Sequence, residues 1–124
     1  MAKQHSPQFL KLANDAQDRV ARCSVEQTLD WMKSSSPPML IDVREESEYK
    51  AGHIPSALAL GRGIIERDIE TQVPDPKTKI VLYCGGGFRS ALAAESLGKM
   101  GYSNVISMDG GWSAWKQAGY PIEE

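Results

Sequence analysis

The sequence predicts an α/β domain with a central, mostly parallel sheet and helices on both of its faces. Short apolar runs rich in β-branched residues, clearest at 79–83, are typical of buried strands. The segments between these runs repeat apolar residues at helical spacing. Strands that alternate with helices pair in parallel through right-handed crossovers, which places helices on both faces. A chain of 124 residues is expected to form one such domain.

The first two predicted elements are helices, and each has a recognisable start. Ser6 followed by proline is typical of a helix N-terminus, and apolar residues then recur at helical spacing up to Val20. Ser24 and Gln27 match a capping box, which predicts a second helix over 25–32.

A buried strand, a short helix, a weaker strand and another helix are expected next. The apolar run 39–43 lies between turn-forming residues, so it predicts a strand buried on both faces. A short helix over 46–50 follows and is closed by a glycine. After a turn that contains proline, 57–60 predicts a strand and 64–73 a helix that ends before two prolines.

The C-terminal part repeats the order of strand and helix twice. Strand 79–83 is followed at once by Cys84, and the alanine- and leucine-rich stretch 89–100 predicts a helix. A strand over 104–108 and a helix over 110–116 complete the chain. Ligands of open parallel sheets bind beyond the carboxyl ends of the strands, so Cys84 lies where a site is expected.

Charge and cysteine content exclude several classes of function. A formal net charge of −2 favours neither nucleic acid nor an anionic membrane surface as a partner. The polar N-terminus and the absence of a long apolar run predict a cytoplasmic protein. The two cysteines, Cys23 and Cys84, form no disulfide framework, and together with His5 and His53 they lack the spacing of metal ligands. Reduced thiols and no metal site are therefore expected.

The loop from Cys84 to Ser90 is the candidate site. Its three consecutive glycines allow the backbone to turn N–H groups inward, as an anion-binding cradle requires. The N-terminus of the helix that follows adds free amides and partial positive charge. With Arg89, these features favour the thiolate form of Cys84 and would also hold an anionic persulfide.

Two other chemistries place glycines or a reactive cysteine after a strand. A dinucleotide site has a third glycine where this chain has Ser90, and the chain is too short for both halves of that fold. The familiar signature of a thiol phosphatase has one more residue between its cysteine and its arginine than the four that separate Cys84 from Arg89. Tyr83 also stands where histidine is usual in that signature.

In three segments that occur in order, the sequence resembles a single rhodanese domain. The resemblance covers about 24–122, and it leaves 1–23 as an N-terminal helical extension. Ser56 is a departure, because the family usually has glycine at that position. The matching residues are Asp42-Val43-Arg44-Glu45, Glu48-Tyr49 and Gly52-His53-Ile54-Pro55, then Tyr83-Cys84 through Arg89-Ser90, then Gly110-Gly111-Trp112, Trp115 and Gly119-Tyr120-Pro121.

The resemblance implies the three-layer rhodanese fold and a sulfurtransferase without a metal or organic cofactor. In this mechanism Cys84 is the nucleophile, which takes sulfur from a small anionic donor such as thiosulfate and carries it as a persulfide. The acceptor would be cyanide, a thiol or a protein. The groups expected to bind the anionic donor are Gly85, Gly86, Gly87, Phe88, Arg89 and Ser90.

The resemblance leaves two other functions open. Rhodanese-like domains also serve as non-catalytic binding or regulatory modules, although such modules usually lack the cysteine that this chain has at Cys84. A cysteine-dependent phosphatase or arsenate reductase relative is the third alternative. Asp42 and Arg44 are expected at the end of the neighbouring strand, where they would either support the loop or form an ordinary structural ion pair.

Overall fold

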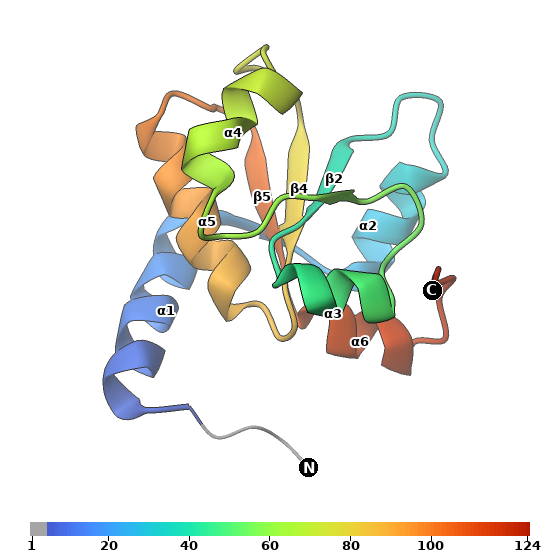
Figure 1. Ribbon diagram of the computed structural model, residues 1–124, viewed down its shortest axis with the longest axis horizontal. Helices are drawn as coiled ribbons and strands as arrows, with labels where there is room; N and C mark the ends of the chain where they lie inside the picture. Colours follow the sequence, from blue (N-terminus) through green and yellow to red (C-terminus); the bar gives the residue numbers. More distant parts are fainter. Residues whose placement is uncertain (1–4) are drawn as a thin grey trace.

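In the computed structural model, which describes residues 5–124, five short strands form one parallel sheet between two layers of helices (Figure 1). The order of the strands across the sheet is β1-β5-β4-β2-β3. The predicted α/β class with helices on both faces is confirmed. The elements are α1 (Pro7–Arg19), β1 (Ala21–Cys23), α2 (Val25–Met32), β2 (Met39–Asp42), α3 (Glu46–Ala51), β3 (Leu58–Ala59), α4 (Ile65–Gln72), β4 (Ile80–Tyr83), α5 (Phe88–Lys99), β5 (Val105–Met108) and α6 (Gly111–Gln117).

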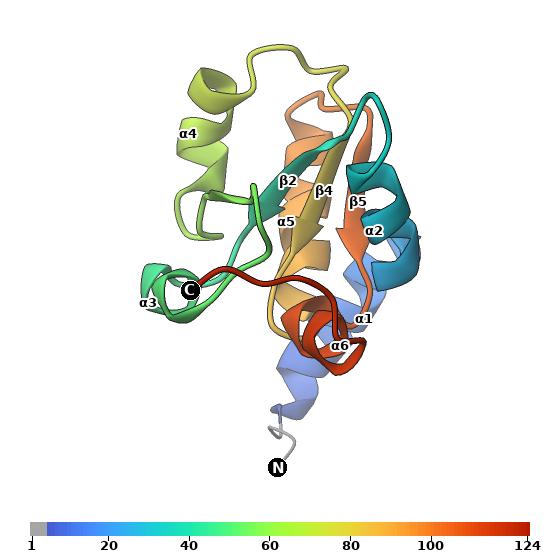
Figure 2. The same cartoon turned by 90° about the vertical axis from the view of Figure 1, so that its right-hand side faces the viewer.

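Two apolar cores hold the layers together. One core joins the sheet to α4 and α5, and the other joins the opposite face to α2 and α6. Helix α1 packs on α5, and α3 lies at the carboxyl end of the sheet (Figure 2). Every side chain of β4 is buried, which accounts for the continuous apolar run at this central strand. No helix of residues 5–124 has the length and apolar character needed to cross a membrane.

The predicted elements agree with the observed ones to within one residue at each end, but one strand was not predicted. Between helices α1 and α2, Ala21–Cys23 form the strand that was not predicted, β1, which pairs in parallel with β5 at the edge of the sheet. A strand of three residues is too short to display a period of two. The first four residues of the predicted extension 1–23 lie outside the described residues.

Cys23 itself belongs to the core. Its thiol is buried, and its sulfur lies 3.3 Å from the hydroxyl oxygen of Thr28. Burial raises the pKa of Cys23, because a thiolate would lose its hydration there. Cys23 is therefore a neutral packing residue rather than a nucleophile.

Backbone hydrogen bonds extend the sheet slightly beyond the carboxyl ends of its central strands. Val43 donates its N–H to the carbonyl of Tyr83 over 2.9 Å, and Leu60 donates to the carbonyl of Asp42 over 3.0 Å. Cys84, Val43 and Leu60 therefore form a row across β4, β2 and β3, and all three pack in the core below α4 and α5. This row defines the edge of the sheet at which the site lies.

The turn after Pro55 generates a prediction about stability. Ser56 has φ 71, and among residues 5–124 it is the one residue other than glycine with a positive φ. A left-handed conformation costs an L-residue about 1–2 kcal/mol, and glycine removes this strain. Part of the gain is offset because glycine loses more conformational entropy than serine when the chain folds. Ser56→Gly should therefore raise the free energy of unfolding by up to about 1 kcal/mol in a urea titration.

The matched control is Ser96→Gly, which places the same change inside α5. Glycine is unfavourable within a helix, so this variant should lose stability by about 0.5–1 kcal/mol. A Ser56→Gly variant that is destabilised as much as Ser96→Gly would contradict the assignment of strain to this turn.

Candidate active site

Cys84 occupies the bend between β4 and α5, and backbone amides converge on its sulfur. Gly87 donates its N–H to Sγ over 3.1 Å, and Ser90 donates its N–H over 3.3 Å. The Ser90 hydroxyl lies 3.5 Å from Sγ and 2.8 Å from the hydroxyl of Ser107. The side chain of Cys84 is 1% exposed. The two backbone N–H groups are placed to donate to negative charge on the sulfur.

Glycine at position 87 is required by both conformation and space. Gly87 has φ 102 and forms the N-cap of α5. A Cβ atom at this position would lie 3.3 Å from the backbone nitrogen of Gly110. The left-handed turn at Gly87 is what directs its own N–H toward Sγ while α5 begins immediately after it.

The start of α6 fixes the other side of the loop. Trp112 donates its backbone N–H to the carbonyl of Cys84 over 2.7 Å, and Ser113 donates to the carbonyl of Gly85 over 3.0 Å. In a planar trans peptide, the N–H of the next residue points opposite to the carbonyl. The N–H groups of Gly85 and Gly86 are therefore turned away from α6.

Helix α1 holds a third carbonyl of the same loop. The Gln17 side-chain amide donates to the carbonyl of Gly87 over 3.3 Å, which turns the N–H of Phe88 away from α1. The ring of Phe88 packs edge-on against Phe9 and His5, with ring centroids 6.0 Å and 5.1 Å apart. Sequence reasoning did not identify Gln17, because nothing in its local pattern indicates a contact 70 residues away.

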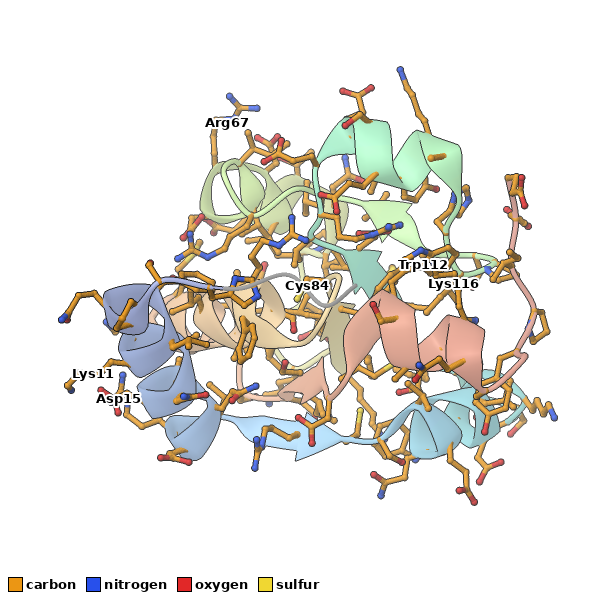
Figure 3. The ribbon with its side chains drawn as sticks, turned by 90° about the horizontal axis from the view of Figure 1, so that it is seen from below. Lys11, Asp15, Arg67, Cys84, Trp112 and Lys116 are labelled. Atoms are coloured by element: carbon orange, nitrogen blue, oxygen red, sulfur yellow. The ribbon has the colours of Figure 1, made fainter. Side chains whose placement is uncertain are left out.

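The loop thus directs carbonyls outward and amides inward. Within residues 5–124, the N–H groups of Gly85, Gly86 and Phe88 donate to no protein acceptor. They lie at the N-terminus of α5, where the helix dipole adds partial positive charge. Figure 3 looks onto this end of the molecule, with Cys84 near the centre between α1 and α6. Such a cradle can hold a small anion next to the sulfur.

Arg89 lies beside the loop, but its guanidinium is paired with a carboxylate. Nitrogens of Arg89 lie 2.9 Å and 3.3 Å from the two carboxylate oxygens of Glu48 on α3. The hydrogen bonds from Arg89 hold the pKa of Glu48 below its ordinary value, and the hydrogen bonds to Glu48 raise the pKa of Arg89. The pair attaches α3 to the loop, and it is about one-third exposed, with 34% for Arg89 and 38% for Glu48. Glu48 belongs to the segments that resemble the rhodanese family, but the sequence by itself indicates no role for it.

Asp42 and Arg44 form a buried ion pair at the end of β2. Asp42 is 0% and Arg44 4% exposed, and their closest nitrogen and oxygen atoms lie 2.8 Å apart. Burial acts to lower the pKa of Arg44, but the hydrogen bonds to Asp42 and its charge outweigh burial and raise this pKa above its ordinary value. Arg44 also donates to the carbonyl of Gly52 over 2.6 Å and lies over the ring of Trp112 at 4.7 Å.

These contacts place Asp42 and Arg44 one step away from Cys84. Arg44, which Asp42 holds in place, lies over the ring of Trp112, and the backbone N–H of Trp112 donates to the carbonyl of Cys84. A supporting role for the pair in the reaction stays a prediction. No group of three or more His, Cys, Asp or Glu side chains in residues 5–124 is arranged to hold a metal ion.

The chain is similar to proteins of one family. Residues 24–118 match the family described as "Rhodanese-like domain". Thiosulfate sulfurtransferase GlpE of Pseudoalteromonas translucida is 35% identical over 96 residues, which are 77% of this chain and 88% of that protein. An uncharacterized protein of Synechocystis is 36% identical over 96 residues, and this match spans 52% of its length.

A solved structure extends the similarity to nearly the whole chain, including α1. It is the structure of a protein of unknown function from Rhodopseudomonas palustris, described as a possible tyrosine phosphatase. The two chains are 32% identical, the TM-score is 0.82, and 99% of each chain is covered. The fold and the position of α1 therefore occur together in another protein.

The contact between α6 and the loop generates a prediction. Gly111 has φ 53, and a Cβ atom there would lie 2.3 Å from the carbonyl oxygen of Cys84. Gly119 also has a positive φ, 75, but a Cβ atom there would meet nothing within 4 Å. Gly119→Ala should lower the free energy of unfolding by about 1–2 kcal/mol through backbone strain alone. Gly111→Ala should lower it by about 1–3 kcal/mol more, because the loop must move.

The rate of alkylation of Cys84 distinguishes a variant in which the loop has moved from one that is only less stable. Only Gly111→Ala should change the rate at which iodoacetamide alkylates Cys84, since it alone moves the amides that surround Sγ. Equal stabilities and equal alkylation rates for the two variants would show that α6 does not constrain the loop.

Proposed function

The chain belongs to the rhodanese-like domain family, and from this premise we propose that it is a sulfurtransferase that carries sulfur as a persulfide on Cys84. The observation that carries the proposal is the convergence of loop amides on Sγ, from Gly87 at 3.1 Å and Ser90 at 3.3 Å. Relatives named thiosulfate sulfurtransferase support the same activity. The loop amides would stabilise Cys84 both before and after it takes up sulfur, because the thiolate and the persulfide are both anions.

In the first half of the reaction, Cys84 takes sulfur from an anionic donor such as thiosulfate. The thiolate of Cys84 attacks the outer sulfur, the sulfur–sulfur bond of the donor breaks, and sulfite leaves with the bonding electron pair. Negative charge moves from Sγ to the outer sulfur of the new persulfide. The N–H groups of Gly85, Gly86 and Phe88 have no acceptor within the described residues, so they are available to stabilise this charge.

In the second half, a thiophilic acceptor removes the outer sulfur. Cyanide or a thiolate attacks that sulfur, the persulfide bond breaks, and Cys84 leaves as the thiolate held by Gly87 and Ser90. The thiolate is thus regenerated without a separate general base. The acceptor is a small molecule or a protein thiol.

Arg89 is proposed to attract the anionic donor to the loop. Its guanidinium is close to Gly85, where a Cβ atom would lie 3.1 Å from one of its nitrogens. Glu48 neutralises part of this charge and keeps the guanidinium in place. The proposed role for Arg89 is therefore to attract and position the donor and to stabilise the negative charge that moves during transfer.

Two alternatives are weaker than sulfur transfer. The Rhodopseudomonas protein is described as a possible tyrosine phosphatase, but the ring from Cys84 to Arg89 holds four intervening residues, one fewer than the familiar phosphatase signature. A smaller ring suits a single sulfur better than a tetrahedral phosphoryl group. A non-catalytic binding module is disfavoured by the intact cysteine and its amide donors.

Substitution of the two cysteines tests the mechanism. Cys84→Ser should remain folded but transfer no sulfur from thiosulfate to cyanide, because its hydroxyl forms no persulfide. Cys23→Ser should keep the activity, since Cys23 is buried against Thr28 on the opposite core. Intact mass after incubation with thiosulfate should reveal one added sulfur atom in the wild type and in Cys23→Ser only.

The same proteins decide between the alternatives. Sulfur transfer retained by Cys84→Ser would exclude the persulfide mechanism. Hydrolysis of an aryl phosphate by the wild type but not by Cys84→Ser, at a rate comparable with sulfur transfer, would establish a phosphatase instead.

A pair of variants tests the electrostatic role of Arg89. Arg89→Ala should cost about 2–4 kcal/mol of transition-state stabilisation, or about 30- to 1,000-fold in kcat/KM for thiosulfate, by analogy with removal of an oxyanion donor. Glu48→Gln removes the paired negative charge but retains an oxygen that can accept the N–H of Glu45. This variant should not lose kcat/KM for thiosulfate. Equal losses in both variants would show that the pair acts only as a structural link.

A further inference from the structure

Ser107 is a polar residue at a buried position of the central sheet. It lies in β5 beside Leu82 of β4, and it is 1% exposed. Alternate residues of a strand share a face, so Ser107 faces the same layer as Val105, which packs against the core below α4 and α5. A buried hydroxyl costs free energy unless it forms a hydrogen bond. The serine at this position therefore needs a hydrogen-bond partner inside the molecule.

That partner is Ser90, in the first turn of α5. The hydroxyl oxygens of Ser107 and Ser90 lie 2.8 Å apart, and the hydroxyl oxygen of Ser90 lies 3.5 Å from Sγ of Cys84. All three residues are buried. Within residues 5–124, the side-chain hydroxyls of these two serines have no other hydrogen-bond partner. The two hydroxyls, called the serine pair below, therefore connect β5 to the sulfur.

The number of hydrogens sets the direction of these hydrogen bonds. A thiolate carries no proton, so the Ser90 hydroxyl must be the donor to Sγ when Cys84 is ionised. The oxygen of Ser90 then accepts, and the O–H of Ser107 is the donor within reach. If the Cys84 thiol instead donated to Ser90, and Ser90 to Ser107, the O–H of Ser107 would be left buried without an acceptor in the described residues. Both hydroxyl hydrogens are used only when the serine pair donates toward the sulfur.

The hydrogen bond that Ser90 accepts strengthens the one that it donates. Consecutive hydrogen bonds polarise one another, and in the low dielectric of a protein interior each of them is stronger than in water. The contact with Ser107 also limits the rotation of the Ser90 hydroxyl, so less entropy is lost when this hydroxyl donates to Sγ. Ser107 can therefore affect the sulfur of Cys84 without touching it.

We propose that Ser107 is a positioning residue that stabilises the thiolate of Cys84 through the hydroxyl of Ser90. No bond to Ser107 forms or breaks, and both serines keep their protons. In the proposed reaction the thiolate is the species that attacks the donor and the species that leaves when an acceptor removes sulfur, so the serine pair supports both halves. The inference itself concerns the reactivity of the thiol, and its test needs no sulfur donor.

The test measures alkylation of Cys84 by iodoacetamide as a function of pH, because the thiolate is the nucleophile. The folded protein is alkylated, and the mass of the peptide that carries Cys84 distinguishes this residue from Cys23. Ser107→Ala should lower the rate about two- to tenfold at pH values where the thiolate is the minor form, the range expected for one lost hydrogen bond. The plateau at high pH, where every Cys84 is ionised, should change little.

Matched variants separate the effect of the hydroxyl from the effect of packing. Ser107→Thr and Ser107→Val introduce side chains of nearly the same shape, of which only threonine has a hydroxyl, so Ser107→Thr should react faster below the plateau. Thr28→Val removes another buried hydroxyl, which lies 3.3 Å from Sγ of Cys23, and it should leave the pH profile of Cys84 unchanged. Melting temperatures of all variants accompany the rates.

A double-mutant cycle shows whether Ser107 acts through Ser90. The loss of rate caused by Ser107→Ala should disappear when Ser90→Ala is already present, because the connection to the sulfur is then broken. An equal loss in both backgrounds would overturn the proposal, as would identical pH profiles for Ser107→Thr and Ser107→Val. A lowered melting temperature with an unchanged profile in Ser107→Ala would make Ser107 a structural residue only. Failure of sulfur transfer in the wild type would exclude the proposed function but not this inference, since alkylation uses no sulfur donor.

Discussion

The site depends first on the orientation of a few peptide planes. Two N–H groups at the start of α6 hold the carbonyls of Cys84 and Gly85, and a side chain of α1 holds the carbonyl of Gly87. Each of these bonds turns the following N–H in the opposite direction, because a trans peptide is planar. The orientation of the amides around the sulfur is therefore set by residues of α6 and α1 that bond to carbonyls of the loop. The hydrogen bond from Trp112 also brings the start of α6 close to the Cys84 carbonyl, so there is no room for a side chain at Gly111.

The second organising feature is the pairing of charges at the carboxyl edge of the sheet. Asp42 and Arg44 neutralise one another in a fully buried pair, and removal of one partner would leave an uncompensated charge. Glu48 and Arg89 form a more exposed pair that links α3 to the loop. Arg62 stands apart from this pattern, since its guanidinium has no such partner in the described residues.

Helix α1 is part of the environment of the site rather than a separate appendage. It lies before the segment 24–118 that matches the family, yet it contacts the loop through Gln17 and packs Phe9 against Phe88. Its packing on α5 also fixes the helix whose N-terminus faces the sulfur. The side of the loop opposite α6 is therefore closed by a segment that the family match does not include.

Local information in the sequence determined the fold class, ten of the eleven elements and the loop that carries Cys84. Apolar periodicity, caps and glycines act within one turn or one strand, so they are visible in the chain itself. Strand β1 was not predicted, because three residues are too few to show the alternating pattern of a strand. Its conformation depends instead on pairing with β5, which is distant in the sequence. Only the tertiary structure decided the partners of the loop: Trp112, Gln17 and Glu48 reach it from three helices. Such contacts depend on how separate elements pack, and no local pattern of residues specifies that packing.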